Sequence, residues 1–191
     1  MRYTVFATNW GWAALAGGDD TVRAVFLPNL PTNLCSLREA RKTAEAFFSR
    51  YLDSLEYRPN LLKRVRRSIV KYFEGLPIHD WECDVDLSPY SSFTAEVLAL
   101  ARTIPYGQTV TYKELALTLG KPNHYRAVAQ ALAKNQVPII VPCHRVVASR
   151  GLGGFSSGGG VNMKLRLLSL EKANLLYLKA TMRASLQSPS R

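Results

Sequence analysis

The chain has 191 residues, of which 47% are hydrophobic and 20% are charged, as is typical of a globular protein with one or two domains. Three widely spaced cysteines, Cys35, Cys83 and Cys143, argue against a disulfide framework and indicate a reducing compartment. No apolar run is long enough to span a membrane.

The formal net charge of +11 is unevenly distributed. Residues 1–91 hold 12 Lys/Arg and 11 Asp/Glu, whereas residues 92–191 hold 13 and 3. A basic second half favours binding to a polyanion, with nucleic acid preferred over a solvated basic face without a partner.

The first half predicts a small sheet followed by helices. Three short strands are predicted, at residues 3–8, 12–16 and 22–27. Turns at "NWG" and "GGDD" separate them, and Asn9 and Gly11 interrupt the apolar stretch, which favours strands over a signal peptide. Pro28 and Pro31 end the third strand. Helical spacing of apolar residues predicts an amphipathic helix over residues 37–55.

Residues 63–92, which follow this helix, have a less regular sequence pattern. The basic residues between positions 63 and 71 form either a solvated face, which we favour, or a second phosphate contact. Residues 76–92 predict a strand and then a linker. His79 and Cys83 have the spacing of two metal ligands, but no second pair completes a site, so no metal is expected.

The second half predicts a helix-turn-helix. Ser92 or Thr94 is expected to cap a helix, and a later helix has Thr111 as N-cap with Glu114 three residues on, a capping box. "KPN" is a tight turn, and "HYRAVAQALAKN" is a second helix of about three turns. A buried strand, "VPIIVP", a Gly-rich loop and a closing helix over residues 163–176 follow.

The pair Cys143–His144 at the end of that apolar run is the candidate reactive site. Neighbours in a regular strand point to opposite faces, so His144 can act on Cys143 only if Pro142 breaks the strand or a water bridges them. Glu171 on the closing helix is the candidate to orient His144. Such a relay predicts a thiol pKa below about 8.5. The alternatives are a buried inert cysteine and a Glu171 that pairs only within its own helix.

The motif "VPIIVPCHRVV", preceded by "RAVAQALAKN" and followed by "GGFSSGG…K…LL…E", resembles the O6-alkylguanine-DNA alkyltransferase family, the methylated-DNA–protein-cysteine methyltransferases. The match runs from about Phe93 to Glu171, and its Pro-Cys-His-Arg-Val core is highly specific. Residues 1–85 match the family only loosely, through the opening strands.

The resemblance implies DNA repair by direct, single-use transfer of an alkyl group to Cys143, without a cofactor. The substrates would be O6-alkylguanine and O4-alkylthymine in double-stranded DNA, flipped out through the minor groove. His144 would take the Cys143 proton through water, and Glu171 would orient His144. Tyr112 would donate to guanine N3 and help to rotate the target phosphate.

Further residues carry over by motif position. Arg126 would fill the gap left by the flipped base, and Asn135 would join the reader helix to the active-site strand. The Val146 carbonyl and the Ser156 N–H would contact the base. Phe155 stands in the pocket where many members have Tyr.

Alanines recur along the predicted reader helix. Small side chains let a helix approach a minor groove only about 6 Å wide, so Ala127 and Ala131, with Ala129 and Ala133, are expected at DNA. The alternative is that they are simply good helix formers.

The expected fold is therefore α+β. Residues 1–85 would form an RNase H-like α/β domain, and residues 86–91 a linker. Residues 92–176 would form a winged-helix-like domain with the helix-turn-helix and the active-site cysteine, and residues 177–191 a partly disordered tail. The protein would be a monomer without membrane contact, located in the cytoplasm at the nucleoid or, in a eukaryote, in the nucleus.

The sequence is also compatible with two other functions. One is a protein that binds the lesion without transfer and marks it for other repair. The other is a regulatory helix-turn-helix protein with an inert cysteine.

Overall fold

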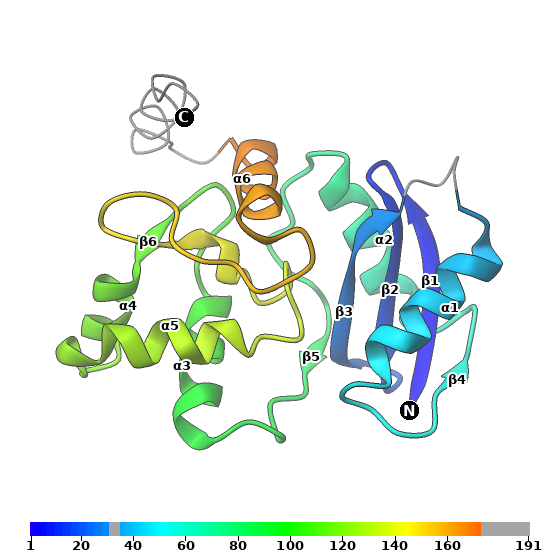
Figure 1. The fold of residues 1–191 in the computed structure, drawn as a ribbon, viewed down its shortest axis with the longest axis horizontal. Helices are drawn as coiled ribbons and strands as arrows, with labels where there is room; N and C mark the ends of the chain where they lie inside the picture. The colour runs from blue at the N-terminus through cyan, green and yellow to red at the C-terminus, as the bar shows by residue number, and fades with distance from the viewer. Residues whose placement is uncertain (31–34, 173–191) are drawn as a thin grey trace, which may run out of the picture.

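A computed structural model describes residues 1–30 and 35–172. It has a mixed α+β architecture, with a sheet flanked by helices at one end and a group of helices at the other (Figure 1). The strands are β1 (Arg2–Thr8), β2 (Gly11–Gly17), β3 (Thr21–Leu30), β4 (Glu56–Tyr57), β5 (Asp84–Val85), β6 (Val110–Thr111) and β7 (Val146–Val147). The α-helices are α1 (Leu37–Phe48), α2 (Lys63–Phe73), α3 (Ser92–Arg102), α4 (Tyr112–Thr118), α5 (Tyr125–Ala133) and α6 (Gly160–Leu170).

The N-terminal sheet has the strand order β4-β1-β2-β3-β5. The three long strands are antiparallel neighbours, and the two short outer strands pair in parallel with β1 and β3. The three strands predicted from the sequence are confirmed, but the predicted end of the third strand at Pro28 is wrong, because β3 continues to Leu30. Gly17 is required at the second turn, because a Cβ there would lie 2.0 Å from the Thr21 carbonyl oxygen.

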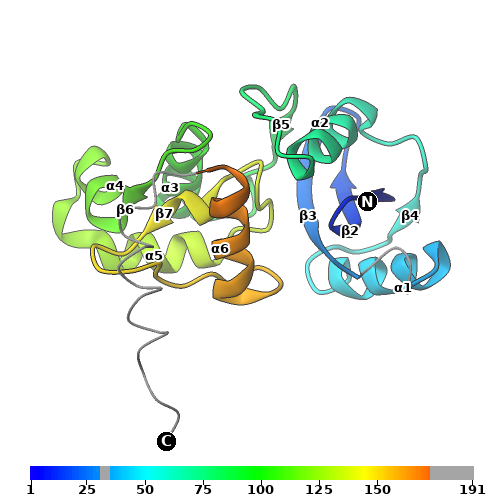
Figure 2. The same cartoon turned by 90° about the horizontal axis from the view of Figure 1, so that it is seen from above.

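Different parts of the chain cover the two faces of this sheet, because side chains alternate between the faces along a strand. Ala14 and Ala16 face α1, whose buried side begins at Ala40. Ala13 and Leu15 belong to the opposite face, where α2 and the second half of the chain pack. Figure 2 shows α1 and α2 on opposite sides of the sheet.

Helix α1 begins with a capping box, in which Ser36 accepts from the Glu39 N–H and the Glu39 carboxylate accepts from the Ser36 N–H. It ends at Phe48, so the predicted extension to residue 55 is wrong. Downstream, residues 76–83 form no strand, and β5 has two residues. In α2, Lys63, Arg64, Arg67 and Lys71 are exposed, as expected for a solvated face.

The helix-turn-helix is present as α4 and α5, joined by a short 3-10 turn at Pro122–His124. The capping box of Thr111 and Glu114 is confirmed, and Gly120 has a φ of +70°. Helix α3 packs on α5, and its N-cap is Ser91, so the predicted cap at Ser92 or Thr94 is wrong. Helix α6 begins earlier than predicted and ends at Leu170. Residues 173–191, where the helix was expected to continue and the tail to follow, lie outside the described residues.

The segment "VPIIVP" is buried, but it is a turn rather than the predicted strand. Ile139 has a φ of +66°, and the Val141 N–H donates to the Val137 carbonyl at 2.9 Å. Pro138 and Pro142 have no N–H to give to a ladder, and the Asn135 side chain takes over the pairing. Its Nδ2 donates to the Val141 carbonyl and its Oδ1 accepts from the Val137 N–H, both at 2.9 Å.

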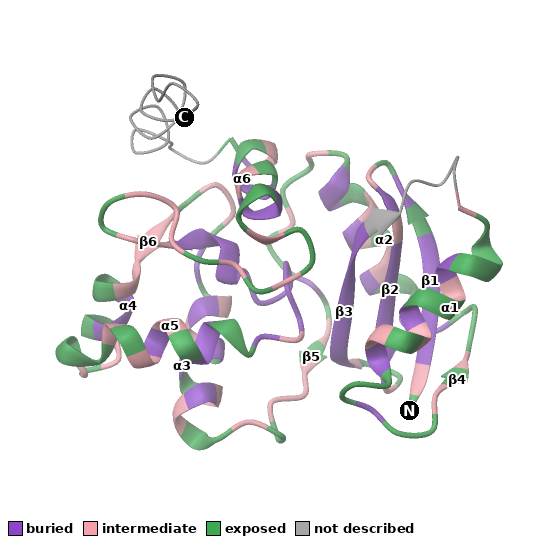
Figure 3. Ribbon diagram, viewed as in Figure 1, coloured by how far each residue is buried: buried purple, intermediate pink, exposed green. Residues whose placement is uncertain are grey.

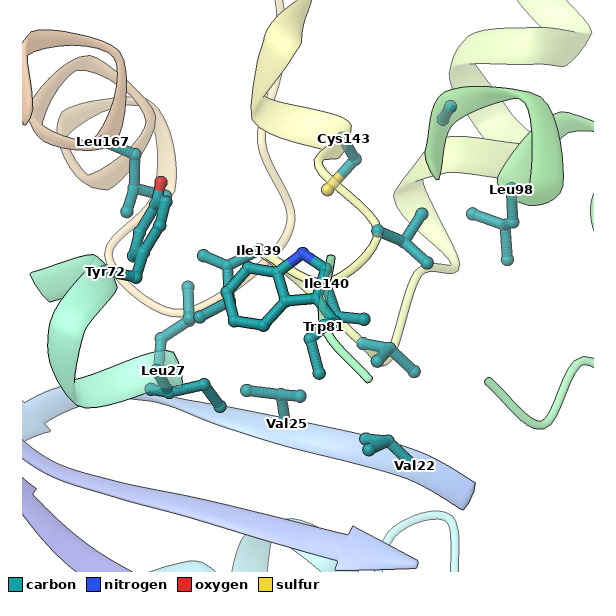
Figure 4. Close-up of a cluster of buried hydrophobic side chains, with 14 of the residues drawn as sticks. Val22, Val25, Leu27, Tyr72, Trp81, Leu98, Ile139, Ile140, Cys143 and Leu167 are labelled. Atoms are coloured by element: carbon teal, nitrogen blue, oxygen red, sulfur yellow. The ribbon is translucent and has the colours of Figure 1, made fainter. Parts of the chain in front are cut away.

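This turn packs directly on strand β3, as Figure 4 shows. Leu27, Trp81 and Ile140 belong to one apolar cluster that is continuous from the sheet to Cys143. The Val25 N–H of β3 donates to the Gln136 carbonyl at 2.8 Å. The sheet therefore supports the turn that precedes Cys143. Figure 3 shows the buried residues running through both halves. No helix in the described residues is long and apolar enough to cross a membrane.

Candidate active site

Cys143 begins a 3-10 turn (Cys143–Arg145) directly after Pro142. As expected, no regular strand continues through Cys143 and His144, although the chain leaves the extended conformation before Pro142, at Ile139. The side chain is 6% exposed and lies in a pocket of about 360 Å³. The other residues that line this pocket are Tyr112, Ala129, Leu132, Ala133, Gly154, Phe155 and Ser156. Asn135 donates from Nδ2 to the Cys143 sulfur at 3.1 Å, so the residue that shapes the turn also holds the nucleophile.

The thiol is not activated in the protein alone. Burial raises the pKa of Cys143, and the Asn135 hydrogen bond and the Lys164 charge oppose this only in part. The predicted depression of this pKa is therefore wrong, because removing a thiolate from water outweighs the nearby donors. Cys143 is a thiol near neutral pH and needs a base.

Glu171 lies at the centre of a buried hydrogen-bond network. Five donors reach its carboxylate: Tyr72 Oη at 2.6 Å, His144 Nε2 at 2.8 Å, Arg145 Nε at 2.9 Å, Arg145 Nη2 at 3.0 Å and the Gly107 N–H at 3.1 Å. Burial raises its pKa, but the hydrogen bonds and charges of His144 and Arg145 outweigh burial and lower the pKa to about 2. The expected meeting of His144 and Glu171 is confirmed: Glu171 hydrogen-bonds to His144 and forms an ion pair with Arg145 instead of pairing within its own helix.

His144 is fully buried, and burial lowers its pKa although Glu171 opposes the shift. An ionised carboxylate only accepts hydrogen bonds, so the ring nitrogen facing Glu171, Nε2, carries the proton. Nδ1 then has the free lone pair, and no described protein atom hydrogen-bonds to it. His144 is thus a neutral imidazole with one unengaged basic nitrogen.

Three buried residues of this site were missed in the sequence. Arg145 is the charge partner of Glu171, and its place beside His144 in the motif was the available signal. Lys164 donates to the Val146 carbonyl at 2.7 Å and the Gly154 carbonyl at 3.0 Å, and burial lowers its pKa to about 8. Tyr72 lies 72 positions before His144, and nothing local in the sequence marks it.

The pocket wall contains the other predicted side chains. Tyr112 donates to the Gly154 carbonyl at 3.5 Å, and the Ser156 hydroxyl donates to the Ala133 carbonyl at 2.7 Å. A Cβ on Gly153 would lie 2.8 Å from the Tyr112 ring, so only glycine lets this loop pass so close. Phe155 lines the pocket beside these residues.

Only some of the alanines of helix α5 are exposed or line the pocket. Arg126 is exposed near its start, Ala127 is partly exposed, and Ala129 and Ala133 line the pocket. The predicted DNA contact by Ala131 is wrong. It is 3% exposed because it shares the inner face of the helix, which packs on α3.

Comparisons with known proteins agree with this geometry. The family described as 6-O-methylguanine DNA methyltransferase, DNA binding domain, matches residues 92–173. The methylated-DNA–protein-cysteine methyltransferase of Methanopyrus kandleri is 46% identical over 112 residues, which cover 59% of this chain and 82% of the relative. That of Mus musculus is 35% identical over 178 residues, which cover 90% of this chain and 81% of the relative.

Among solved structures, Mycobacterium tuberculosis OGT in complex with DNA has a TM-score of 0.71 at 30% identity, and the match covers 90% of this chain and 93% of that one. The chain belongs to the O6-methylguanine-DNA methyltransferase family. It is accordingly a DNA-binding methyltransferase of DNA repair, acting by alkyl transfer to a cysteine.

Proposed function

We propose that Cys143 is the residue that receives the alkyl group from O6-alkylguanine in DNA. The observation that carries this assignment is the placement of its buried sulfur in a pocket, beside a histidine whose Nε2 is held by Glu171. Cys35 and Cys83 are only partly buried, and neither lines this pocket.

The transfer balances without a co-reactant. The Cys143 proton passes to Nδ1 of His144, through water, and the sulfur attacks the alkyl carbon. The S–C bond forms as the C–O6 bond breaks, and one proton returns to the departing guanine. The product is a thioether, which is a poor leaving group, so the protein is consumed in one turnover. O4-alkylthymine offers the same kind of carbon and is the second proposed substrate.

A base must leave the duplex to reach this sulfur. Cys143 is 6% exposed and lies inside a pocket, where a base stacked in a duplex cannot present its O6 atom, so base flipping is the route that the chemistry requires. Arg126 would occupy the emptied stack, Tyr112 would contact the base and its phosphate, and the Val146 carbonyl and Ser156 N–H would receive the base. Asn135 would keep the reader helix and the nucleophile in register through its bonds to the turn.

We also propose a division of the chain into two units joined by a linker. Residues 1–85 would form an RNase H-like unit, residues 86–91 a linker, and the rest a winged-helix-like unit that binds DNA as a monomer. The turn-on-sheet packing supports a scaffold role for the first unit.

Peptide mass analysis after incubation with a duplex containing O6-methylguanine tests the assignment. We expect a single methyl group on the Cys143 peptide. Cys143→Ala should abolish transfer and leave DNA binding largely intact, because phosphate contacts come from other residues. Cys83→Ala is the matched control and should transfer normally. Binding without any mass shift would favour a lesion-marking protein, and equal binding to unmodified and methylated duplexes without transfer would favour a regulatory protein.

A further inference from the structure

A residue from the first half of the chain reaches into the catalytic network. Tyr72, at the end of α2, is fully buried, and its hydroxyl donates to Glu171 Oε1 at 2.6 Å. The same hydroxyl oxygen lies 3.3 Å from His144 Nε2. The Tyr72 ring is fixed by contacts with Trp81 and Tyr106, with ring centroids 5.9 and 6.0 Å away.

We propose that Tyr72 is a positioning residue for alkyl transfer, which fixes the Glu171 carboxylate and thereby keeps the His144 proton on Nε2. This inference rests on the proposed role of Cys143 and extends it. The first half of the chain would then be part of the active site through one hydroxyl group.

The hydrogen-bonding possibilities at Glu171 Oε1 support this role. This oxygen accepts from Tyr72, His144 and Arg145 together. The Tyr72 hydroxyl has one proton, which it gives to the carboxylate, so its lone pairs remain for the nearby Nε2–H. A proton on Nε2 therefore meets two acceptors, whereas an unprotonated Nε2 would face two lone pairs. The arrangement selects the tautomer that leaves Nδ1 as the base.

The hydroxyl remains a donor throughout the working pH range. Burial raises the pKa of Tyr72 well above its ordinary value, and the Glu171 charge acts in the same direction. Besides Tyr72, the groups that face His144 are Glu171 and Lys164 on the α6 side and Arg145 from its own turn. Glu171 favours the charged imidazole, and the two cations disfavour it.

The neighbouring tyrosine does not duplicate this role. Tyr106 also packs near the network, but its hydroxyl donates to the Gly75 carbonyl at 3.2 Å and the Leu170 carbonyl at 3.3 Å. Within the described part of the chain, Tyr72 is the tyrosine whose hydroxyl bonds to the Glu171 carboxylate. A substitution of Tyr72 should therefore affect proton transfer, which a change in packing alone would not do.

Tyr72→Phe in the full chain tests the proposal, because it removes the hydroxyl and retains the ring. We expect single-turnover methyl transfer near neutral pH to slow roughly tenfold, the effect of one lost hydrogen bond to a charged group. Without this donor, Glu171 Oε1 stabilises the imidazolium more strongly, so the acidic limb of the pH–rate profile should move to higher pH. Tyr3→Phe is the matched control, since Tyr3 is equally buried and donates to Glu45, away from the site. It should leave the profile unchanged.

An unchanged rate and profile in Tyr72→Phe would overturn the proposal. So would a slower rate that keeps the wild-type acidic limb, because that result indicates a packing effect alone. A second measurement needs no variant: the nitrogen chemical shifts of His144 in the unaltered protein should show the proton on Nε2, and a proton on Nδ1 would also overturn it. Methyl transfer to Cys143 by the wild type, measured alongside, tests the proposed function separately.

Discussion

Replacing Glu171 with Gln should destabilise the protein as well as slow the transfer. Glutamine keeps one acceptor oxygen but turns an NH2 group toward donors that now bond to a carboxylate. It also removes the charge partner of Arg145, which is 4% exposed and cannot recover its hydration in place. A buried cation without its partner is among the most destabilising single changes.

The magnitude follows from the pKa of the carboxyl group. The folded protein lowers it from the ordinary value of 4.5 to about 2. At about 1.4 kcal/mol for each pH unit, this difference corresponds to about 3 kcal/mol of stability. For a protein of this length, such a loss lowers Tm by roughly 6–12 °C. Because the folded pKa lies below the unfolded one, the stabilisation is fully present above pH 4.5 and is lost as the pH falls toward about 2.

Denaturant unfolding of wild type and Glu171→Gln at several pH values measures this contribution. We expect a difference in unfolding free energy of about 3 kcal/mol near neutral pH, which narrows as the solution is acidified below pH 4.5. Glu96→Gln is the control, because the Glu96–Lys121 pair, 3.0 Å apart, is exposed and should contribute less than about 1 kcal/mol. A neutral-pH difference for Glu171→Gln as small as that control, or one independent of pH, would refute this account.

Two further substitutions test the DNA and thiol parts of the site. Arg126→Ala should slow repair in duplex DNA more than reaction with the free alkylated base, which needs no flipping; equal losses in the two single-turnover assays would make Arg126 structural or a simple phosphate contact. Lys164→Met should slow transfer by removing a cation that favours the Cys143 thiolate, and the rate deficit should narrow above about pH 8, where wild-type Lys164 itself loses its charge. A deficit that is constant across this pH range would show that the Lys164 charge is not what matters.

The sequence predicted the elements that depend on local rules. The capping box of Thr111 and Glu114 and the three opening strands rest on neighbours within a few residues, and all are present. The turn at residues 136–142 could not be found in this way. Its apolar composition is that of a buried strand, but Ile139 adopts a left-handed conformation that side-chain bonds from Asn135 support. Ala131 was misplaced because composition alone does not say which face of a helix is covered.

The candidate site was predictable where the motif is contiguous or where one carboxylate was available. Cys143, His144 and Glu171 were named for that reason, and the structure brings His144 and Glu171 together. Tyr72 lies 99 positions before Glu171, and only the packing of α2 against the second half reveals their contact. The thiol pKa was predicted with the wrong sign because desolvation depends on depth of burial, which a sequence does not give.

The raised pKa of Cys143 is consistent with the proposed single use of this cysteine. A low-pKa, exposed thiolate reacts with oxidants and free electrophiles, and each such event would waste the protein. Burial keeps Cys143 as an unreactive thiol, while the neutral His144 nearby retains a free lone pair for its proton. In the proposed mechanism, reactivity then depends on an alkyl carbon entering the pocket, where the sulfur loses its proton and forms the S–C bond. The burial that suppresses background chemistry therefore also requires a base for the thiol, and we propose that the hydrogen-bond network of this base extends to Tyr72 from the first half of the chain.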